Sequence, residues 1–323
     1  MSRSLAPAVE ITAAAISASR ERIPAVFRDS PQFISEPLSR ELGVSVVVKV
    51  ETANPIGCFK GRGTWLAVSE LVARGEVGEG RGLVVASAGN FGQGVAYAGR
   101  ALGVPVAVFA ALNANRSKVA AMARLGADVR QAGEDFDAAR EAAAAHAAAS
   151  GWELLVDGAD PWIAIGAGSM ACELTDGVTA GALPVLEAVY VPVGNAALIN
   201  GIGVWMRDAA PGTRVIGVQA AGAPAMTLSW RARRAIETER ADTIADGIAA
   251  RVPVPEALAV MLQVVDEIRL VDDPAILDAT ERMSAALPLS IEPSAGAALA
   301  AALQNPPSGP VALILTGGNI ASA

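Results

Sequence analysis

The sequence has a single histidine, His146, and two cysteines, Cys58 and Cys172, among its 323 residues. The histidine lies in an alanine-rich run that predicts a plain helix, with no carboxylate, cysteine or serine at a useful spacing. A histidine-based catalytic triad and a zinc site with several histidines are therefore disfavoured. The cysteines are far apart and lack the C-x-x-C spacing of a redox or metal site, which predicts a reducing compartment.

Positive charge and uninterrupted apolar runs are also scarce. The chain has 25 Lys and Arg against 33 Asp and Glu, a formal net charge of -8, which disfavours a phosphate backbone or an anionic membrane as partner. Proline, glycine and asparagine interrupt the two longest uncharged stretches, 188–206 and 293–323, so neither predicts a membrane helix. Because the first residues also lack the apolar core of a signal peptide, we expect a cytoplasmic protein that binds neither nucleic acid nor membrane.

Hydrophobic residues are abundant, at 52% of the chain, and they occur in short runs that alternate with longer helical ones. Several short runs are apolar on both faces, as in buried parallel strands. The predicted strands span residues 44–50, 82–87, 104–110, 188–193, 215–219 and 311–315. The predicted helices span residues 62–74, 91–102, 117–125, 135–150, 166–177 and 273–286. This alternation predicts an α/β protein whose mainly parallel sheet is covered by helices.

Three predicted strands lead directly into loops rich in glycine and asparagine, at residues 87–94, 194–203 and 316–319. In open α/β sheets, ligands bind beyond the carboxyl ends of the strands, where backbone amides and helix N-termini can hold an anion. Any one of these loops could be an ordinary strand-to-helix turn. Their joint occurrence predicts one shared ligand site.

Lys60 follows a predicted strand and an Asn-Pro-Ile-Gly turn, and it stands just before a predicted helix. An ammonium is disfavoured near the positive end of a helix. The position therefore suits an amine that must be neutral to form an imine. A solvated lysine or an ion-pair partner for Glu51 would fit the same position.

The segment Asn-Pro-Ile-Gly-Cys-Phe-Lys-Gly-Arg-Gly at residues 54–63 resembles the Asn-Pro-x-Gly-Ser-Phe-Lys-x-Arg-Gly signature of the fold-type II pyridoxal-phosphate (PLP) enzymes, with Cys58 in place of serine. Further segments match this family in order along nearly the whole chain. One of them, Thr-Ile-Ala-Asp-Gly at 243–247, is typical of serine/threonine dehydratases (threonine ammonia-lyases). The resemblance implies two open, twisted, mainly parallel sheets with helices on both faces. It also implies a large PLP-binding domain (1–76 plus 153–323), a small domain (77–152), an active site in the cleft between them, and a homodimer.

The resemblance also implies a role for each matched residue. Lys60 would hold the cofactor through a Schiff base and then act as base at the substrate α-carbon. The other implied cofactor contacts are Phe59 against the ring, Asn90 at the ring hydroxyl, Glu292 at the ring edge, Thr316 at the pyridine nitrogen, and the amides of Gly194, Asn195, Ala196, Ala197 and Leu198 around the phosphate. The implied substrate-binding residues are Ser87, Ala88, Gly89, Asn90 and Phe91.

Several residues depart from the family's pattern. Asn195, Ala196 and Ala197 replace glycines, so an amide that needs positive φ would be strained at alanine. Ala88 stands where serine racemases have the serine that reprotonates the α-carbon, which disfavours racemisation. Gln219 and Ala225 replace the carboxylates of the racemase-like cation site, so we expect no metal there. For Glu292, a helix cap is an equally good interpretation.

The implied activity is β-elimination from an L-β-hydroxy-α-amino acid such as threonine or serine, giving a 2-oxo acid and ammonia. A hydroxyl at the pyridine nitrogen makes the ring a weaker electron sink, which favours elimination or β-replacement over transamination. Because the chain ends soon after residue 318, we expect no regulatory domain. β-Replacement, racemisation and a non-catalytic α/β module for a phosphate ligand remain alternatives. The substrate could be threonine, serine, hydroxyaspartate or an aryl-serine.

Overall fold

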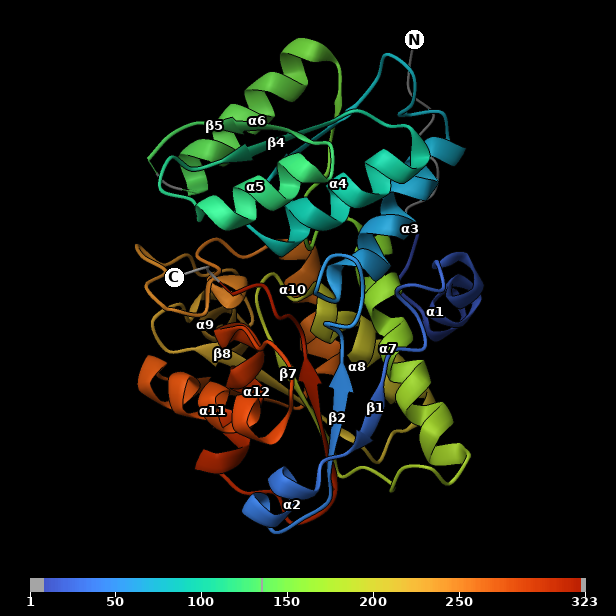
Figure 1. Ribbon diagram of the computed structural model, residues 1–323, viewed down its shortest axis with the longest axis vertical. Helices are drawn as coiled ribbons and strands as arrows, with labels where there is room; N and C mark the ends of the chain where they lie inside the picture. Colours follow the sequence, from blue (N-terminus) through green and yellow to red (C-terminus); the bar gives the residue numbers. More distant parts are fainter. Residues whose placement is uncertain (1–8, 135, 321–323) are drawn as a thin grey trace.

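The computed structural model describes residues 9–134 and 136–320, which form two separate β-sheets (Figure 1). The larger sheet has the strand order β1-β2-β10-β7-β8-β9. Its strands are β1 (Gln32–Ile34), β2 (Val46–Val50), β7 (Ala188–Pro192), β8 (Arg214–Ala220), β9 (Glu267–Val271) and β10 (Val311–Leu315). Of these six, β1 alone pairs antiparallel with its neighbour. The predicted mainly parallel α/β architecture is confirmed.

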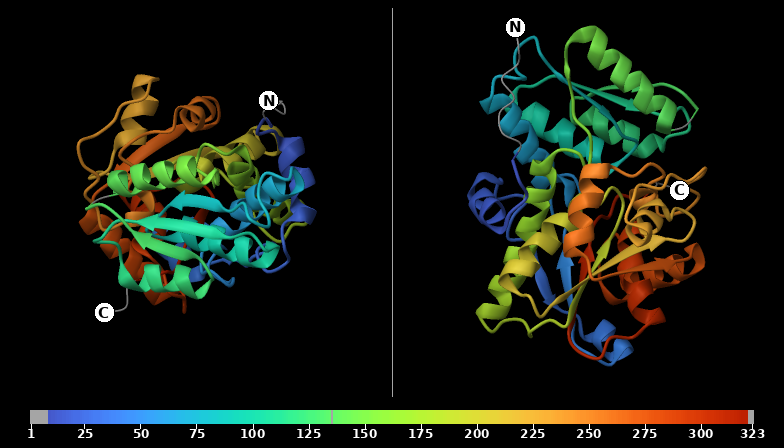
Figure 2. Two further views of the ribbon diagram at one scale, coloured as in Figure 1. Left: turned by 90° about the horizontal axis from the view of Figure 1, so that it is seen from above. Right: turned by 180° about the vertical axis from the view of Figure 1, so that it is seen from behind.

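The second sheet has four parallel strands in the order β5-β4-β3-β6. They are β3 (Leu83–Ala86), β4 (Val106–Ala110), β5 (Asp128–Gln131) and β6 (Glu153–Leu154). Figures 1 and 2 show this sheet and its helices at one end of the molecule and the six-stranded sheet at the other. Strand β6 extends this unit two residues past the predicted boundary at 152, because it adds to the edge of β3. The domain boundaries themselves remain a prediction.

All six predicted helices are present: α3 (Lys60–Ala73), α4 (Asn90–Leu102), α5 (Arg116–Arg124), α6 (Phe136–Ser150), α7 (Pro161–Thr179) and α11 (Asp273–Ala286). Helix α7 begins five residues before its prediction because Asp160 accepts the Trp162 amide at 2.8 Å and Pro161 occupies the first helical position. Six further helices are α1 (Ala13–Ser19), α2 (Glu36–Leu42), α8 (Ala197–Ala209), α9 (Ala225–Ala232), α10 (Pro255–Val264) and α12 (Pro293–Gln304). None of the described helices is long and apolar enough to cross a bilayer.

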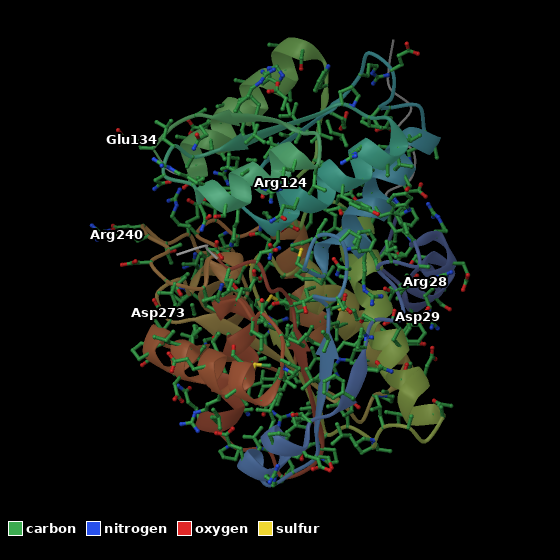
Figure 3. The ribbon with its side chains drawn as sticks, in the orientation of Figure 1. Arg28, Asp29, Arg124, Glu134, Arg240 and Asp273 are labelled. Carbon is green, nitrogen blue, oxygen red and sulfur yellow. The ribbon has the colours of Figure 1, made fainter. Side chains whose placement is uncertain are left out.

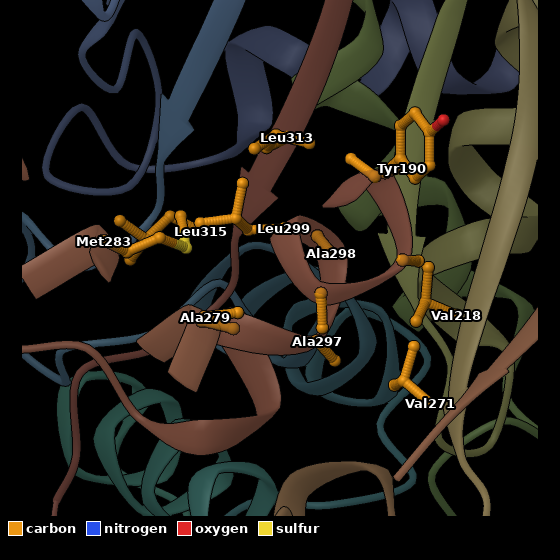
Figure 4. Packing of buried hydrophobic residues seen from close by; sticks show 14 of the residues in the cluster. Tyr190, Val218, Val271, Ala279, Met283, Ala297, Ala298, Leu299, Leu313 and Leu315 are labelled. Atoms are coloured by element: carbon orange, nitrogen blue, oxygen red, sulfur yellow. The ribbon is translucent and has the colours of Figure 1, made fainter. Parts of the chain in front are cut away.

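Helices cover both faces of the six-stranded sheet. One face packs against α2, α11 and α12, and the other packs against α7, α8 and α10. Figure 4 shows residues of α11 and α12 next to residues of the strands in the first of these clusters. Consecutive strand residues therefore enter different cores: Val48 lies in the first cluster and Val47 in the second. This explains why β2 has valines on both faces, with the buried Lys49 as its one charged residue.

A buried charge cluster fixes the start of α3, the helix that begins with Lys60. The fully buried Arg62 guanidinium donates to Glu51 at 2.8 and 2.9 Å and to Glu173 on α7 at 3.0 Å. Lys49 of β2 also pairs with Glu173. Burial acts to raise the pKa of Glu173, but its bonds to Arg62 and Lys49 outweigh this and lower the pKa to about 2. The cluster links β2, α3 and α7 close to Lys60.

Candidate active site

Lys60 lies at the first position of α3, and its ammonium group contacts a carboxylate from a distant part of the chain. The Nζ atom donates to Oδ2 of Asp157 at 2.7 Å, and Asp157 lies in the turn between β6 and α7. The rings of Phe59 and Phe91 have their centres 4.8 and 5.8 Å from Nζ. Glu51 pairs with Arg62 and not with Lys60, so the ion pair considered from the sequence is replaced by one with Asp157.

The loop before Lys60 is paired with the loop that follows β10. Cys58 and Gly317 form an antiparallel bridge, and the Phe59 amide donates to the Thr316 carbonyl at 3.0 Å. The two loops meet because β2 and β10 are neighbouring parallel strands that end at the same edge of the sheet. Burial raises the pKa of the Cys58 thiol to about 12, so this cysteine stays protonated and is not a nucleophile.

Thr316 carries a buried hydroxyl for which the described residues provide no hydrogen-bond partner. A buried polar atom of this kind normally has a partner, so we expect an external group to accept or donate a hydrogen bond here. The pyridine nitrogen of PLP, which the resemblance places at this residue, is such a group. A neutral hydroxyl can meet that nitrogen without protonating it.

Asn90, at the start of α4, is hydrogen-bonded to two other side chains. Its Nδ2 donates to Glu292 Oε1 at 2.8 Å, and its Oδ1 accepts from Asn319 Nδ2 at 2.8 Å. Glu292 occupies the N-cap position of α12, yet its side chain makes no capping hydrogen bond. The carboxylate therefore does not make the helix cap that the sequence offered as one interpretation, because it accepts from Asn90 instead, and its place at the cofactor ring edge stays a prediction.

Burial raises the pKa of Glu292 to about 7, although Lys118 and the hydrogen bond from Asn90 act in the opposite direction. Its side chain is 2% exposed. Near neutral pH the carboxyl group therefore exists in both protonation states, and it can take up or release a proton next to Asn90. Asp246 also contributes to the raised pKa.

The loop at the start of α8 has the features of an anion site. In the described part of the chain, the amides of residues 194–198 donate to no backbone carbonyl. These are the free N–H groups expected at a helix N-terminus. Ala196 has φ = 66°, so the strain expected from alanine at a positive φ is present in this loop.

The loop from Ser87 to Phe91 is organised by the serine. Ser87 Oγ accepts the amides of Gly89 at 3.2 Å and Gly92 at 2.9 Å, which leaves its proton free to donate. Ala88, Gly89 and Asn90 are partly exposed, whereas Phe91 is buried in the core of the small sheet. The loop can therefore offer a hydroxyl proton to a substrate carboxylate, as the prediction for this loop requires.

Lys118 of α5 lies beside this loop. A Cβ atom added to Gly89 would lie 3.8 Å from Lys118 Nζ, and the ammonium pairs with Asp246 of the other sheet's unit. Asp273 at the start of α11 holds the segment that carries Asp246, because its carboxylate accepts a hydrogen bond from the Thr243 hydroxyl. Asp273 is labelled in Figure 3. A cation thus stands next to the loop predicted to bind the substrate carboxylate.

Asp157, Asn319, Lys118 and Asp246 are site residues that the sequence analysis did not single out. Asn319 lies in the loop at residues 316–319 and Asp246 in the Thr-Ile-Ala-Asp-Gly segment, so these two segments could have identified them. Nothing in the sequence near Asp157 indicates that its turn reaches Lys60. Among the described residues, no group of three or more His, Cys, Asp or Glu side chains could hold a metal ion.

The residues present fit PLP. They provide an amine, an unpartnered buried hydroxyl and a loop of free amides. These three segments follow β2, β10 and β7, which are neighbouring parallel strands that end at the same edge of the six-stranded sheet. Lys60 would hold the cofactor, Thr316 would meet its ring nitrogen, Phe59 and Asn90 would contact its ring, and residues 194–198 would bind its phosphate.

Comparisons with known proteins agree with PLP as the cofactor. A family model described as "Pyridoxal-phosphate dependent enzyme" matches residues 25–317. The L-threonine ammonia-lyase of Thermotoga maritima is 34% identical over 288 residues, which cover 88% of this chain and 70% of that protein. The structure of the processed form of threonine deaminase isoform 2 from Solanum lycopersicum is 29% identical, with a TM-score of 0.85, covering 95% and 90% of the two chains. A PLP-dependent aspartate racemase structure is 27% identical, with a TM-score of 0.88 and 98% coverage of both chains.

The chain therefore belongs to the family of pyridoxal-phosphate dependent enzymes. It is a PLP-dependent ammonia-lyase by its relatives, and its sheets and helices are those of fold type II. The family, fold class, cofactor and enzyme class predicted from the sequence are confirmed.

Proposed function

We propose that this enzyme eliminates the β-hydroxyl group of an L-β-hydroxy-α-amino acid, such as threonine or serine, and releases a 2-oxo acid and ammonia. The observation that carries the proposal is the placement of Lys60 and the unpartnered Thr316 hydroxyl on two loops that pair with each other. A neutral hydroxyl does not protonate the pyridine nitrogen, so the cofactor ring withdraws electrons less strongly than a ring with a protonated nitrogen. This weaker withdrawal is enough when a β-substituent leaves.

The chain's own residues have the following roles in the proposal. PLP, when bound, withdraws electrons from the substrate α-carbon. Lys60 Nζ accepts the α-proton, and the β-hydroxyl leaves with a proton as water. The released enamine then takes up water to give the 2-oxo acid and ammonia. Ser87 and the amides of Asn90 and Phe91 hold the substrate carboxylate, while the Gly89 amide donates to Ser87 Oγ. Asn90 orients the ring through its bonds to Glu292 and Asn319.

The assignment of the cofactor to Lys60 can be tested directly, because the chain has few lysines to which it could be attached. The chain has three, Lys49, Lys60 and Lys118. Borohydride reduction of the holoenzyme followed by peptide mass analysis should place the cofactor on Lys60 alone. Lys60→Ala should abolish both the label and ammonia release from threonine and serine. A label on Lys118, or full lyase activity in Lys60→Ala, would show that the site is assigned wrongly. Amino-acid product without ammonia would indicate β-replacement or racemisation instead.

We also propose that the protein is a cytoplasmic homodimer and that the active site lies between a large domain (1–76 plus 153–323) and a small one (77–152). The ion pair between Lys118 of α5 and Asp246, which joins the units of the two sheets, supports this location of the site. Light scattering of the holoenzyme should give twice the chain mass of 32.7 kDa.

A further inference from the structure

Asp157 has an unused hydrogen-bonding position beside the catalytic amine. Its Oδ2 accepts from Lys60 Nζ at 2.7 Å, whereas its Oδ1 is buried and receives no hydrogen bond from the described residues. The side chain is 16% exposed. A carboxylate oxygen that is shielded from water and lacks a donor is unfavourable, so this atom is a favourable contact point for a donor on a ligand.

The turn that carries Asp157 is fixed on both sides. Next to it, Gly158 has φ = 90°, and a Cβ atom there would lie 2.7 Å from the Asn195 carbonyl oxygen of the phosphate loop. Three residues after Asp157, the Asp160 side chain accepts the Trp162 amide at 2.8 Å and so caps α7. Close packing at one end and the cap at the other hold the carboxylate near Lys60.

The charge of Asp157 is balanced by Lys60 alone among the ion pairs of the described residues. When the Lys60 nitrogen is neutral during the reaction, this balance is lost. The neighbouring rings of Phe59 and Phe91 provide no donor to replace it. A second cation of the site, Lys118, stands beside Gly89 and is already paired with Asp246.

A base must lie within hydrogen-bond reach of the proton that it removes, so the substrate α-carbon approaches Lys60 Nζ. The β-substituent is one bond further along. Since Asp157 Oδ2 contacts the same nitrogen at 2.7 Å, its carboxylate is placed to reach that substituent. We propose that Asp157 determines substrate specificity: it favours a β-substituent that donates a hydrogen bond, and it excludes amino acids whose side chain carries a carboxylate.

The inference rests on the proposed function and narrows its substrate class. The hydroxyl groups of threonine and serine can donate to the unused oxygen of Asp157. Hydroxyaspartate, which the sequence left as a candidate, would place a second carboxylate next to the first. Like charges brought together in a partly desolvated site disfavour binding by roughly 100-fold or more.

The specificity proposed for Asp157 can be tested with two amino acids that lack a β-hydroxyl, because their binding is measured without turnover. L-Alanine and L-aspartate are titrated into the holoenzyme, and binding is measured from the change in absorbance of the bound cofactor. In the wild type, alanine should bind about 100-fold more tightly than aspartate. Asp157→Asn keeps the shape and removes the charge, so it should bring the two affinities within about 10-fold of each other.

Asp160→Asn is the matched control, because it removes a carboxylate from the same turn and asparagine also caps helices well. It should leave the ratio of the two affinities at the wild-type value. Asp157→Ser is a second uncharged variant if Asp157→Asn fails to fold. As a parallel readout, ammonia release from hydroxyaspartate relative to threonine should rise in the uncharged variants.

The failure of this inference and that of the proposed function are distinguishable. Ammonia release from threonine together with equal binding of alanine and aspartate by the wild type would overturn the role of Asp157 alone. An unchanged affinity ratio in both uncharged variants would do the same. Absence of ammonia from every β-hydroxy amino acid would overturn the proposed function, and this inference with it.

Discussion

The Asn319 side chain donates to the Asn90 side chain at 2.8 Å, although 229 positions separate the two residues. The same amide group also donates to the Ile56 carbonyl at 2.9 Å. One asparagine thus connects the last loop of the chain with the loop before Lys60 and with the start of α4. Through Asn90 the connection continues to the buried Glu292.

Asn319→Ala should weaken cofactor binding because Asn90 loses the partner that orients it. Removal of one hydrogen bond of this kind costs about 1 kcal/mol, so the Kd of PLP should rise roughly 5- to 10-fold. The measurement is a titration of apoenzyme with PLP, followed by absorbance. Asn113→Ala, at an exposed position, is the control and should not change the Kd.

Glu292 should make the stability of the apoenzyme fall as pH rises. Its pKa of about 7 in the folded protein exceeds the ordinary value of 4.5, so the folded state binds more protons than the unfolded state between these values. The free energy of unfolding should fall by about 3 kcal/mol between pH 4.5 and 7.5 from this group. Urea unfolding at both pH values measures the change. Glu292→Gln should remove most of it, and an equal fall in the variant would contradict the assignment.

Ala196 and Ala197 form a matched pair for testing backbone strain. Both are buried, but Ala196 has φ = 66° whereas Ala197 is the first residue of α8. Glycine at either position loses the same methyl group and gains the same freedom in the unfolded chain. Because a left-handed conformation costs an L-residue about 1–2 kcal/mol, Ala196→Gly should be more stable than Ala197→Gly by that amount. Equal stabilities in urea would argue against strain at Ala196.

Ala88→Ser should add a racemase activity that the wild type scarcely has. The methyl group of Ala88 cannot donate a proton to the second face of the α-carbon, whereas a serine hydroxyl there can. A well-placed general acid contributes roughly 100- to 10,000-fold, so formation of the D-isomer should become measurable. Chiral analysis of residual substrate after partial turnover is the test. Abundant D-isomer from the wild type would refute the explanation.

Arg62→Met should destabilise the protein strongly. It leaves the buried carboxylates of Glu51 and Glu173 without the guanidinium between them, a change that costs about 3–5 kcal/mol in comparable buried pairs. Arg282→Met removes a surface arginine that pairs with Asp278 and Glu41, and should cost about 1 kcal/mol or less. Thermal and urea unfolding of the two variants should separate them clearly.

Much of this enzyme could be predicted from its sequence. The six predicted strands are all present, because each is a short β-branched run buried on both faces, and this pattern is local. Lys60, Asn90 and Thr316 were identified because each belongs to a compact motif at the end of a strand. The two sheets and the family followed from the order of these motifs. In contrast, the four edge strands β1, β5, β6 and β9 were not predicted, because they are short or interrupted by charged residues.

The sequence by itself determined the elements and the motif residues, because periodicity and turn chemistry act over a few neighbouring positions. Only the tertiary structure decided which side chains complete the site. Asp157 reaches Lys60 from 97 positions away, and Asn319 reaches Asn90 from 229. The left-handed backbone of Ala196 likewise follows from how the loop closes between β7 and α8. Contacts of this kind depend on how strands and helices pack, and no local pattern in the chain encodes them.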